Sequence, residues 1–157
     1  MSGGGASGPA AEPALAALPE GAVLVLYDGV CAMCNGLVRF LLERDRGRDR
    51  FRFLALQSEL GREVVRARGG DPDEVSTLYV LTSPGRPGER VRARGRAGIC
   101  AMTAAGGPWL LLHALRVLPT FLLDAGYRFI ARHRYRIAGR LDACPLPAAE
   151  HRHKFLA

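Results

Sequence analysis

The stretch VLVLYDGVCAMCNG, residues 23–36, decides the fold that we predict for this chain. Residues 23–27 are apolar without alternation, which is typical of a strand with both faces covered. The Asp-Gly pair at 28–29 favours a turn, and Cys31 and Cys34 follow it. From Cys34 onward the apolar residues recur at helical spacing. The stretch therefore predicts a strand, a turn and a helix that begins at the cysteine pair.

The segments that follow predict a β-α-β-α-β-β-α unit. After the first strand and helix we expect a strand at 51–56, a helix at 57–70, a hairpin at 76–94, a short helix at 97–107 and two further helical segments at 108–118 and 124–138. Gly, Ala and Pro dominate residues 1–20, so we predict a disordered tail there. Residues 21–157 are expected to form a single α/β domain that includes a helical extension over 108–142.

The formal net charge of +7 raises the question of a nucleic-acid or membrane partner. The basic residues are spread along the chain instead of forming one block with interleaved aromatics, so we expect no nucleic-acid partner. The apolar segment 107–126 contains His113 and Arg116 and is interrupted by Pro119, which favours a helix packed on its own domain over a membrane span. The alternative is an interfacial helix whose Trp109 and leucines reach lipid headgroups.

Cysteine use and the first residues indicate the compartment. The chain has four cysteines, and only two of them are close in sequence, unlike the dense disulfide framework of a small secreted scaffold. The first twenty residues show no basic start before an apolar core, so no signal peptide is visible. We therefore expect a cytoplasmic protein.

The position of the cysteine pair, at a junction between a strand and a helix, predicts a role for each cysteine. Cys31 would lie at a helix N-terminus, where backbone N–H groups and the helix dipole stabilise a thiolate, so we predict it as the attacking cysteine. Cys34, one turn further and less exposed, is the predicted resolving cysteine. We expect no cofactor and no metal, because Cys100 and Cys144 are single and do not form a second short-spaced pair. If the C-terminal segment folded back towards the cysteine pair, Cys144 could serve as an additional resolving thiol. Residues 151–154 are expected to be a solvated tail.

Three further residues are predicted at this site. Asp28 has two interpretations: it relays a proton to or from Cys34, or it is a turn residue that accepts N–H bonds from the following loop. A hairpin strand antiparallel to the first strand would bring its own start, Val75 and Ser76, beside Cys31. We expect those two residues to bind the substrate, and we rate an ordinary strand-start role for Ser76 as the simpler alternative.

Five motifs in the right order resemble the DCC family of thiol-disulfide oxidoreductases: YDGVCAMC, LQSELG, GGPWLLL, ARHRYRIAGR and CPLP. The resemblance covers about residues 22–156, and the Asp-Cys-Cys motif of the family corresponds to Asp28, Cys31 and Cys34. It implies a thioredoxin-like fold and thiol-disulfide exchange. Where thioredoxin has a cis-proline this chain has Ser76, so we expect a trans peptide bond there and a different substrate pairing.

The function predicted from these features is electron exchange between the CxxC dithiol and a disulfide through a mixed disulfide. The expected partners are a disulfide-containing protein or a small thiol, together with an unidentified reductant or oxidant. The alternative is a non-catalytic interaction module, membrane-peripheral or not, whose CxxC is structural or binds zinc.

Overall fold

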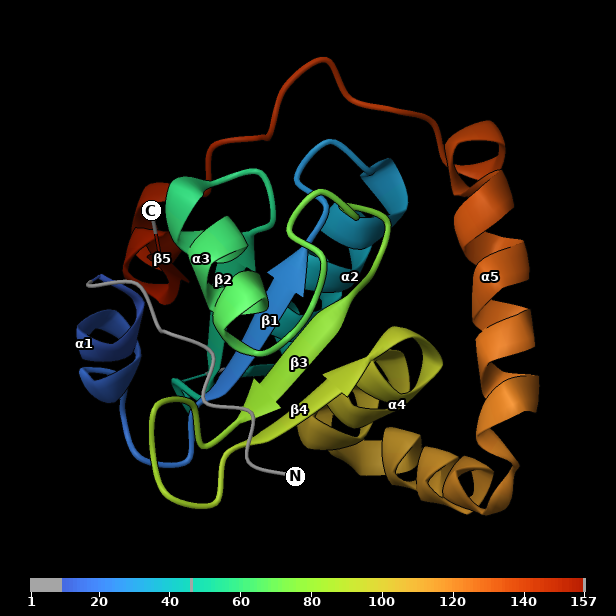
Figure 1. Ribbon diagram of the computed structural model, residues 1–157, viewed down its shortest axis with the longest axis horizontal. Coiled ribbons are helices and arrows are strands. Elements are labelled where there is room, and N and C mark those ends of the chain that lie inside the picture. Colours follow the sequence, from blue (N-terminus) through green and yellow to red (C-terminus); the bar gives the residue numbers. More distant parts are fainter. Residues whose placement is uncertain (1–9, 46, 157) are drawn as a thin grey trace.

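The computed structural model describes residues 10–45 and 47–156, which contain one mixed five-stranded sheet (Figure 1). Its strands are β1 (Val23–Tyr27), β2 (Phe51–Ala55), β3 (Tyr79–Thr82), β4 (Arg90–Ala93) and β5 (Phe155–Leu156), in the spatial order β4-β3-β1-β2-β5. The central strand β1 is parallel to β2 and antiparallel to β3, so Leu26 lies beside both Leu54 and Tyr79.

Helices cover both faces of the sheet. They are α1 (Ala11–Ala16), α2 (Ala32–Asp45), α3 (Glu59–Ala67), α4 (Arg94–Ala105) and α5 (Thr120–Ile137), with 3-10 helices η1 (Gly107–Val117) and η2 (Ala149–Lys154). One core cluster joins β1 to α2 and α4, and a second joins it to α1 and α3. All five residues of β1 are therefore buried, which explains the unbroken apolar run. The elements from β1 to α4 follow the predicted β-α-β-α-β-β-α order of a thioredoxin-like unit.

Helix α1 lies inside the segment 1–20 that we expected to be a disordered tail. Its Ala11 and Leu15 are buried in the core cluster of α3, and the Glu63 carboxylate accepts the N–H groups of Ala10 and Ala11 at 3.2 and 3.1 Å. A helix of six residues is unstable alone, so this tertiary contact decides its structure, and composition could not reveal it. Residues 1–9 lie outside the described part of the chain.

The helical extension expected over 108–142 is interrupted and is followed by a return to the sheet. Residues 107–117 are a 3-10 helix, α5 ends at Ile137, and β5 pairs in parallel with β2. The solvated tail expected at 151–154 is wrong for Lys154, which is buried with its Nζ 2.5 Å from Asp45 Oδ2, whereas Arg152 and His153 are exposed. Among the described helices, none combines the length and the apolar character that crossing a membrane requires.

Replacing Lys154 tests whether the C-terminal strand belongs to the cooperative fold. Among the described residues, Lys154→Met leaves the buried Asp45 carboxylate with the N–H groups of Arg50 and Phe51 as partners. We expect the free energy of unfolding in urea to fall by about 3 kcal/mol, as for other broken buried pairs. The exposed neighbour change Arg152→Met is the control and should cost less than about 0.5 kcal/mol. Equal losses in the two variants would contradict this role of the ion pair.

Candidate active site

The two cysteines lie where β1 ends and α2 begins. Asp28 follows β1, Gln57 follows β2, and Ser76 precedes β3, so three loops meet at one edge of the sheet. This arrangement follows from the topology: β1 and β2 are parallel, and β3 runs antiparallel to β1. Helix α5 stands along the side of the molecule (Figure 1) and contributes side chains from the C-terminal extension.

Cys31 occupies the N-terminal end of α2. The backbone N–H of Cys34 points to Cys31 Sγ at 3.4 Å, and the Cys31 carbonyl accepts the N–H of Asn35 at 3.0 Å. These contacts place both sulfurs at the first turn of α2. Burial differs from our expectation, however, because Cys31 is fully buried whereas Cys34 is partly exposed.

The segment after α5 covers Cys31. Cys31 and Arg140 form an isolated antiparallel β-bridge, and the N–H of Leu141 donates to the Val30 carbonyl at 2.7 Å. These backbone contacts hold residues 139–141 against the start of α2. They explain why the first cysteine of the motif is the more buried one, which the local sequence could not indicate.

Cys34 is held as a neutral thiol at neutral pH. Burial, followed by the hydrogen bond to Cys31 and the charge of that residue, raises the pKa of Cys34 to about 12. Arg134 acts in the opposite direction, with its Nη1 3.8 Å from Cys34 Sγ. Burial outweighs the guanidinium, so the thiol form of Cys34 dominates in the resting site.

Asp28 is the centre of a buried hydrogen-bond network and is only 1% exposed. Its Oδ2 accepts Arg134 Nη2 at 2.8 Å and the Tyr135 hydroxyl, and its Oδ1 accepts Gln57 Nε2 at 2.6 Å and the Val30 N–H at 3.1 Å. The Val30 contact is the one expected of a turn residue. Asp28 also reaches the cysteines indirectly, because Arg134 contacts both Asp28 and Cys34.

Sequence reasoning missed Arg134 and Gln57. Arg134 is one of the repeated arginines of 128–136, and unlike its exposed neighbours Arg132 and Arg136 it is only 4% exposed. Both residues lie within motifs that carry the family resemblance, LQSELG and ARHRYRIAGR, which is the signal that could have singled them out.

Ser76 and Val75 separate in the structure. The Ser76 carbonyl accepts the Tyr127 hydroxyl at 2.9 Å and Arg134 Nη1 at 3.3 Å, which places this backbone beside Cys34. Val75 packs against the core cluster on the α3 face of the sheet. The described residues contain no cis peptide bond, so the bond before Ser76 is trans, as expected. Substrate binding by these two residues stays a prediction.

The remaining cysteines differ in their surroundings. Cys100 is buried in α4, as expected of a small apolar residue. Cys144 is exposed, with its Sγ 3.9 Å from the Tyr27 hydroxyl, and it packs on Gly29, where an added Cβ would lie 2.8 Å from that sulfur. The C-terminal segment therefore folds back to the loop that carries the motif. In the part of the chain that is described, no group of three or more His, Cys, Asp or Glu side chains is placed to hold a metal ion.

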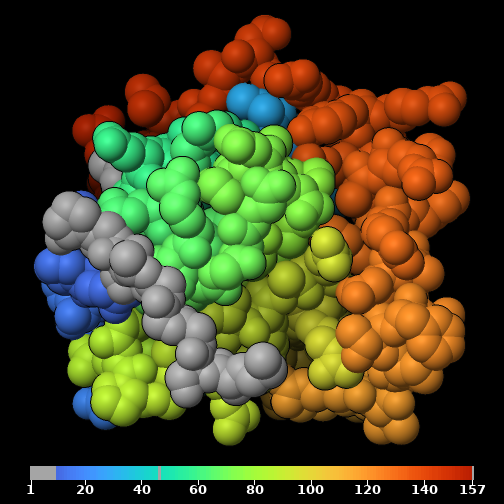
Figure 2. Space-filling model, viewed as in Figure 1, coloured from blue at the N-terminus to red at the C-terminus, as the bar shows by residue number. Residues whose placement is uncertain are grey.

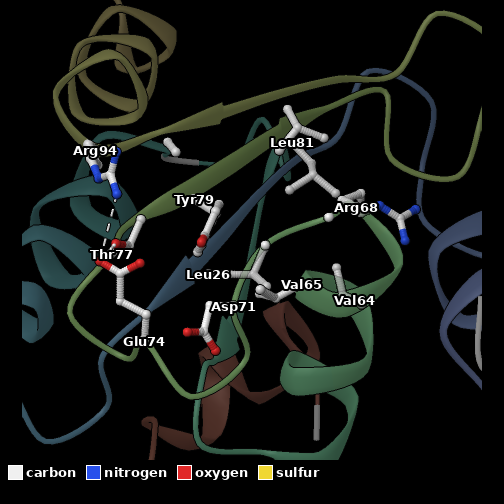
Figure 3. A pocket seen from close by; sticks show the side chains of 14 residues that line it. Leu26, Val64, Val65, Arg68, Asp71, Glu74, Thr77, Tyr79, Leu81 and Arg94 are labelled. Carbon is white, nitrogen blue, oxygen red and sulfur yellow. Dashed lines mark hydrogen bonds and ion pairs between the residues drawn. The ribbon is translucent and has the colours of Figure 1, made fainter. Parts of the chain in front are cut away.

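A cavity of about 440 Å³ lies on the opposite, α3 face of the sheet (Figure 3). Leu26, Val65 and Leu81 form part of its apolar lining. The charged groups at its rim have partners of their own: Arg94 pairs with Glu74 at 3.8 Å, and Arg68 pairs with Glu89 and Glu12. Since none of its lining residues is a cysteine, the cavity is separate from the CxxC site.

Comparison with known proteins agrees with this arrangement. The model of the DCC1-like thiol-disulfide oxidoreductase family matches residues 25–140. A chloroplastic DCC family protein of Arabidopsis thaliana is 35% identical over 124 residues, 78% of this chain and 69% of the relative. The protein YuxK of Bacillus subtilis (strain 168) is 32% identical over 133 residues, 85% of this chain and 93% of the relative. No solved structure matches the chain. With Cys31 and Cys34 adjacent at the start of α2 and a family match over most of its length, the chain belongs to the DCC1-like thiol-disulfide oxidoreductase family.

Proposed function

We propose that this protein exchanges electrons between its Cys31–Cys34 dithiol and a disulfide in a protein or a small molecule. The observation that carries the proposal is the contact of the Cys34 N–H with Cys31 Sγ at 3.4 Å, which places both cysteines at one helix start. A dithiol carries two electrons by itself, so the proposed reaction uses no bound cofactor. The expected cytoplasmic location is part of this proposal.

The proposed reaction has two exchange steps. The Cys31 thiolate attacks one sulfur of the substrate disulfide, which forms a mixed disulfide and releases the first substrate thiolate. Cys34 then loses its proton and attacks Cys31 Sγ, which releases the second substrate thiolate and leaves a Cys31–Cys34 disulfide. The substrate gains two electrons and the protein loses them. A dithiol reductant restores the pair, and with an oxidant as partner the same steps run in reverse.

The contacts around Cys31 and Cys34 support different roles for the two cysteines. Cys31 lies at the start of α2 and its sulfur accepts the N–H group of Cys34, and we assign Cys31 as the attacking residue. Cys34 has a pKa of about 12, so it stays protonated as a thiol until the mixed disulfide forms. The guanidinium of Arg134, 3.8 Å away, then stabilises the charge that Cys34 acquires. In this proposal Asp28 is a positioning residue, because it fixes Arg134 by an ion pair at 2.8 Å.

Access to Cys31 requires a movement of the backbone. Residues 139–141 cover Cys31 through the bridge at Arg140 and the hydrogen bond from Leu141 to Val30. Only a few hydrogen bonds hold this segment, so local opening needs far less free energy than global unfolding. We propose that substrate reaches Cys31 in this opened state.

Trapping with glutathione disulfide tests the assignment of the two cysteines. In a Cys144→Ser background, which removes the exposed thiol, Cys34→Ser should accumulate a stable glutathione adduct on Cys31, seen by intact mass. Cys31→Ser should accumulate much less, because burial, which is the largest cause of the raised pKa of Cys34, persists in this variant. Oxidation of the Cys144→Ser protein should lower its mass by two hydrogen atoms, because formation of the Cys31–Cys34 disulfide releases two protons and two electrons.

Two results would overturn this assignment in different ways. An adduct that forms only in Cys31→Ser would reverse the cysteine roles. No adduct in either variant, together with a zinc atom retained in native mass spectrometry, would replace the redox proposal by the structural alternative.

Arg134→Gln should slow the second step. With both cysteines present, the glutathione adduct should decay to the internal disulfide roughly tenfold more slowly, because the Cys34 thiolate loses its nearby cation. The pH at which this step accelerates should move upward. Arg132→Gln, an exposed change on the same helix, is the control and should leave the rate unchanged. Equal rates in the two variants would show that Arg134 serves stability alone.

Alkylation rates test the burial and ionisation of the cysteines. In the reduced native protein, iodoacetamide should modify exposed Cys144 first, and Cys31 and Cys100 slowly because both are buried. Modification of Cys34 should be slow at neutral pH and accelerate roughly tenfold per pH unit up to alkaline pH, because burial raises its pKa to about 12. Unfolding in urea should equalise the four rates. Fast modification of Cys34 at neutral pH would contradict its assignment as a resting thiol.

A further inference from the structure

Helix α5 has two faces with different roles. Its inner face carries Tyr127 and Arg134, which contact Ser76 and Cys34. Its outer face, with that of η1, is apolar, and no described residue buries it. The exposed large apolar residues of this surface are Leu110, Leu111, Leu115, Val117, Phe121, Leu122, Phe129, Ile130 and Ile137. Figure 1 shows α5 at the side of the molecule and Figure 2 shows its side chains forming one flank of it. We call these nine residues the apolar flank.

The side chains of the apolar flank have large exposed fractions, and they are gathered on one surface instead of being scattered singly. Its exposed fractions run from 37% for Leu115 to 88% for Val117, and Phe121 and Phe129 reach 71% and 65%. Outside this flank, the described large apolar residues that reach comparable exposure are Val91 and Leu146. A gathering of exposed apolar side chains on two consecutive elements, η1 and α5, indicates a surface that binds a partner.

Arginines border the apolar flank along α5. Leu122, Phe129 and Ile137 recur at spacings of seven and eight residues and share one face of the helix. Arg128, Arg132 and Arg136, all exposed, recur every four residues along the adjacent side. Within η1 and α5 these arginines and Arg116 are opposed by a single acidic residue, Asp124. The surface therefore combines apolar side chains with a strong positive charge.

We propose that the apolar flank docks on an anionic lipid surface. A helix with apolar residues on one face and arginines beside them binds at a bilayer interface, where apolar side chains reach the acyl boundary and arginines meet anionic headgroups. Each basic residue near such a surface adds to binding by attraction to the negative lipids. The proposed contact is peripheral, with the helix lying in the plane of the interface.

Charge favours a lipid surface over a second copy of the chain. A twofold dimer applies the same patch to itself. The arginines of one α5 would then approach those of the other, and such a juxtaposition of like charges is unfavourable. In an anionic bilayer, the negative headgroups would pair with the arginines and the acyl chains would contact the apolar side chains.

Docking would also place the redox site near the membrane. The inner face of the same helix holds Ser76 and Cys34 through Tyr127 and Arg134, so the CxxC loop would lie within one helix diameter of the docked face, roughly 10 Å. This consequence rests on the proposed function. Docking would favour thiol-disulfide exchange with disulfides that lie at a membrane surface. The docking itself does not depend on redox activity.

Vesicle flotation of the full chain tests the proposal. We expect the protein to float with vesicles of phosphatidylcholine mixed with phosphatidylglycerol at low salt, and to remain unbound with phosphatidylcholine alone. Phe129→Ser combined with Ile130→Ser should abolish flotation. Arg128→Gln, Arg132→Gln and Arg136→Gln should each lower vesicle affinity roughly fivefold and weaken its salt dependence. Leu146→Ser is the control, because Leu146 is 89% exposed but lies outside the apolar flank.

The outcomes separate docking from redox activity. Binding of the Cys31→Ser variant to the same vesicles should be unchanged, so a failed redox proposal leaves this test valid. Circular dichroism and the free energy of unfolding in urea should be unchanged in the Phe129→Ser, Ile130→Ser double variant, which shows that this variant folds. The proposal is wrong if anionic vesicles bind no protein, or if Leu146→Ser loses binding as much as the α5 variants. It is also wrong if sedimentation shows a dimer that Phe129→Ser dissociates, because a second copy then covers the flank.

Discussion

A single buried ion pair, between Arg134 and Asp28, joins the C-terminal extension to the loop that carries the two cysteines. Their charged groups are 2.8 Å apart, and the side chains are 5% and 1% exposed. Removing such charges from water is costly unless each polar atom finds a partner. Gln57, Tyr135 and the Val30 N–H provide those partners for Asp28. The requirement to satisfy one carboxylate therefore fixes β1, β2 and α5 relative to one another.

The same ion pair sets the electrostatic conditions around the thiols. Arg134 lies between Asp28 and Cys34, so part of its positive charge is already balanced before any thiolate forms. Burial consequently dominates and keeps the pKa of Cys34 high. A cation that is insufficient to ionise a resting thiol still lowers the energy of the charged form during exchange. This network supports the role proposed for Cys34 as the cysteine that reacts second.

A second buried ion pair anchors the other end of the extension. Lys154 reaches Asp45 at the end of α2, and β5 then joins the sheet beside β2. Between the two anchors the chain crosses the CxxC loop, where residues 139–141 cover Cys31 and Cys144 packs on Gly29. The last part of the chain is therefore a component of the candidate active site as well as an addition to the thioredoxin-like unit.

The sequence by itself determined β1, the helix start at the cysteine pair and the β-α-β-α-β-β-α order, because apolar periodicity and turn residues are local properties. Topology rules also placed Ser76 at the correct edge of the sheet. Tertiary structure alone decided that α1 forms, that β5 joins the sheet, and that Cys31 is more buried than Cys34. It also decided the role of Arg134, whose partner Asp28 is 106 residues away. An arginine in a basic amphipathic helix looks like its solvent-facing neighbours until packing shows which one faces a buried carboxylate.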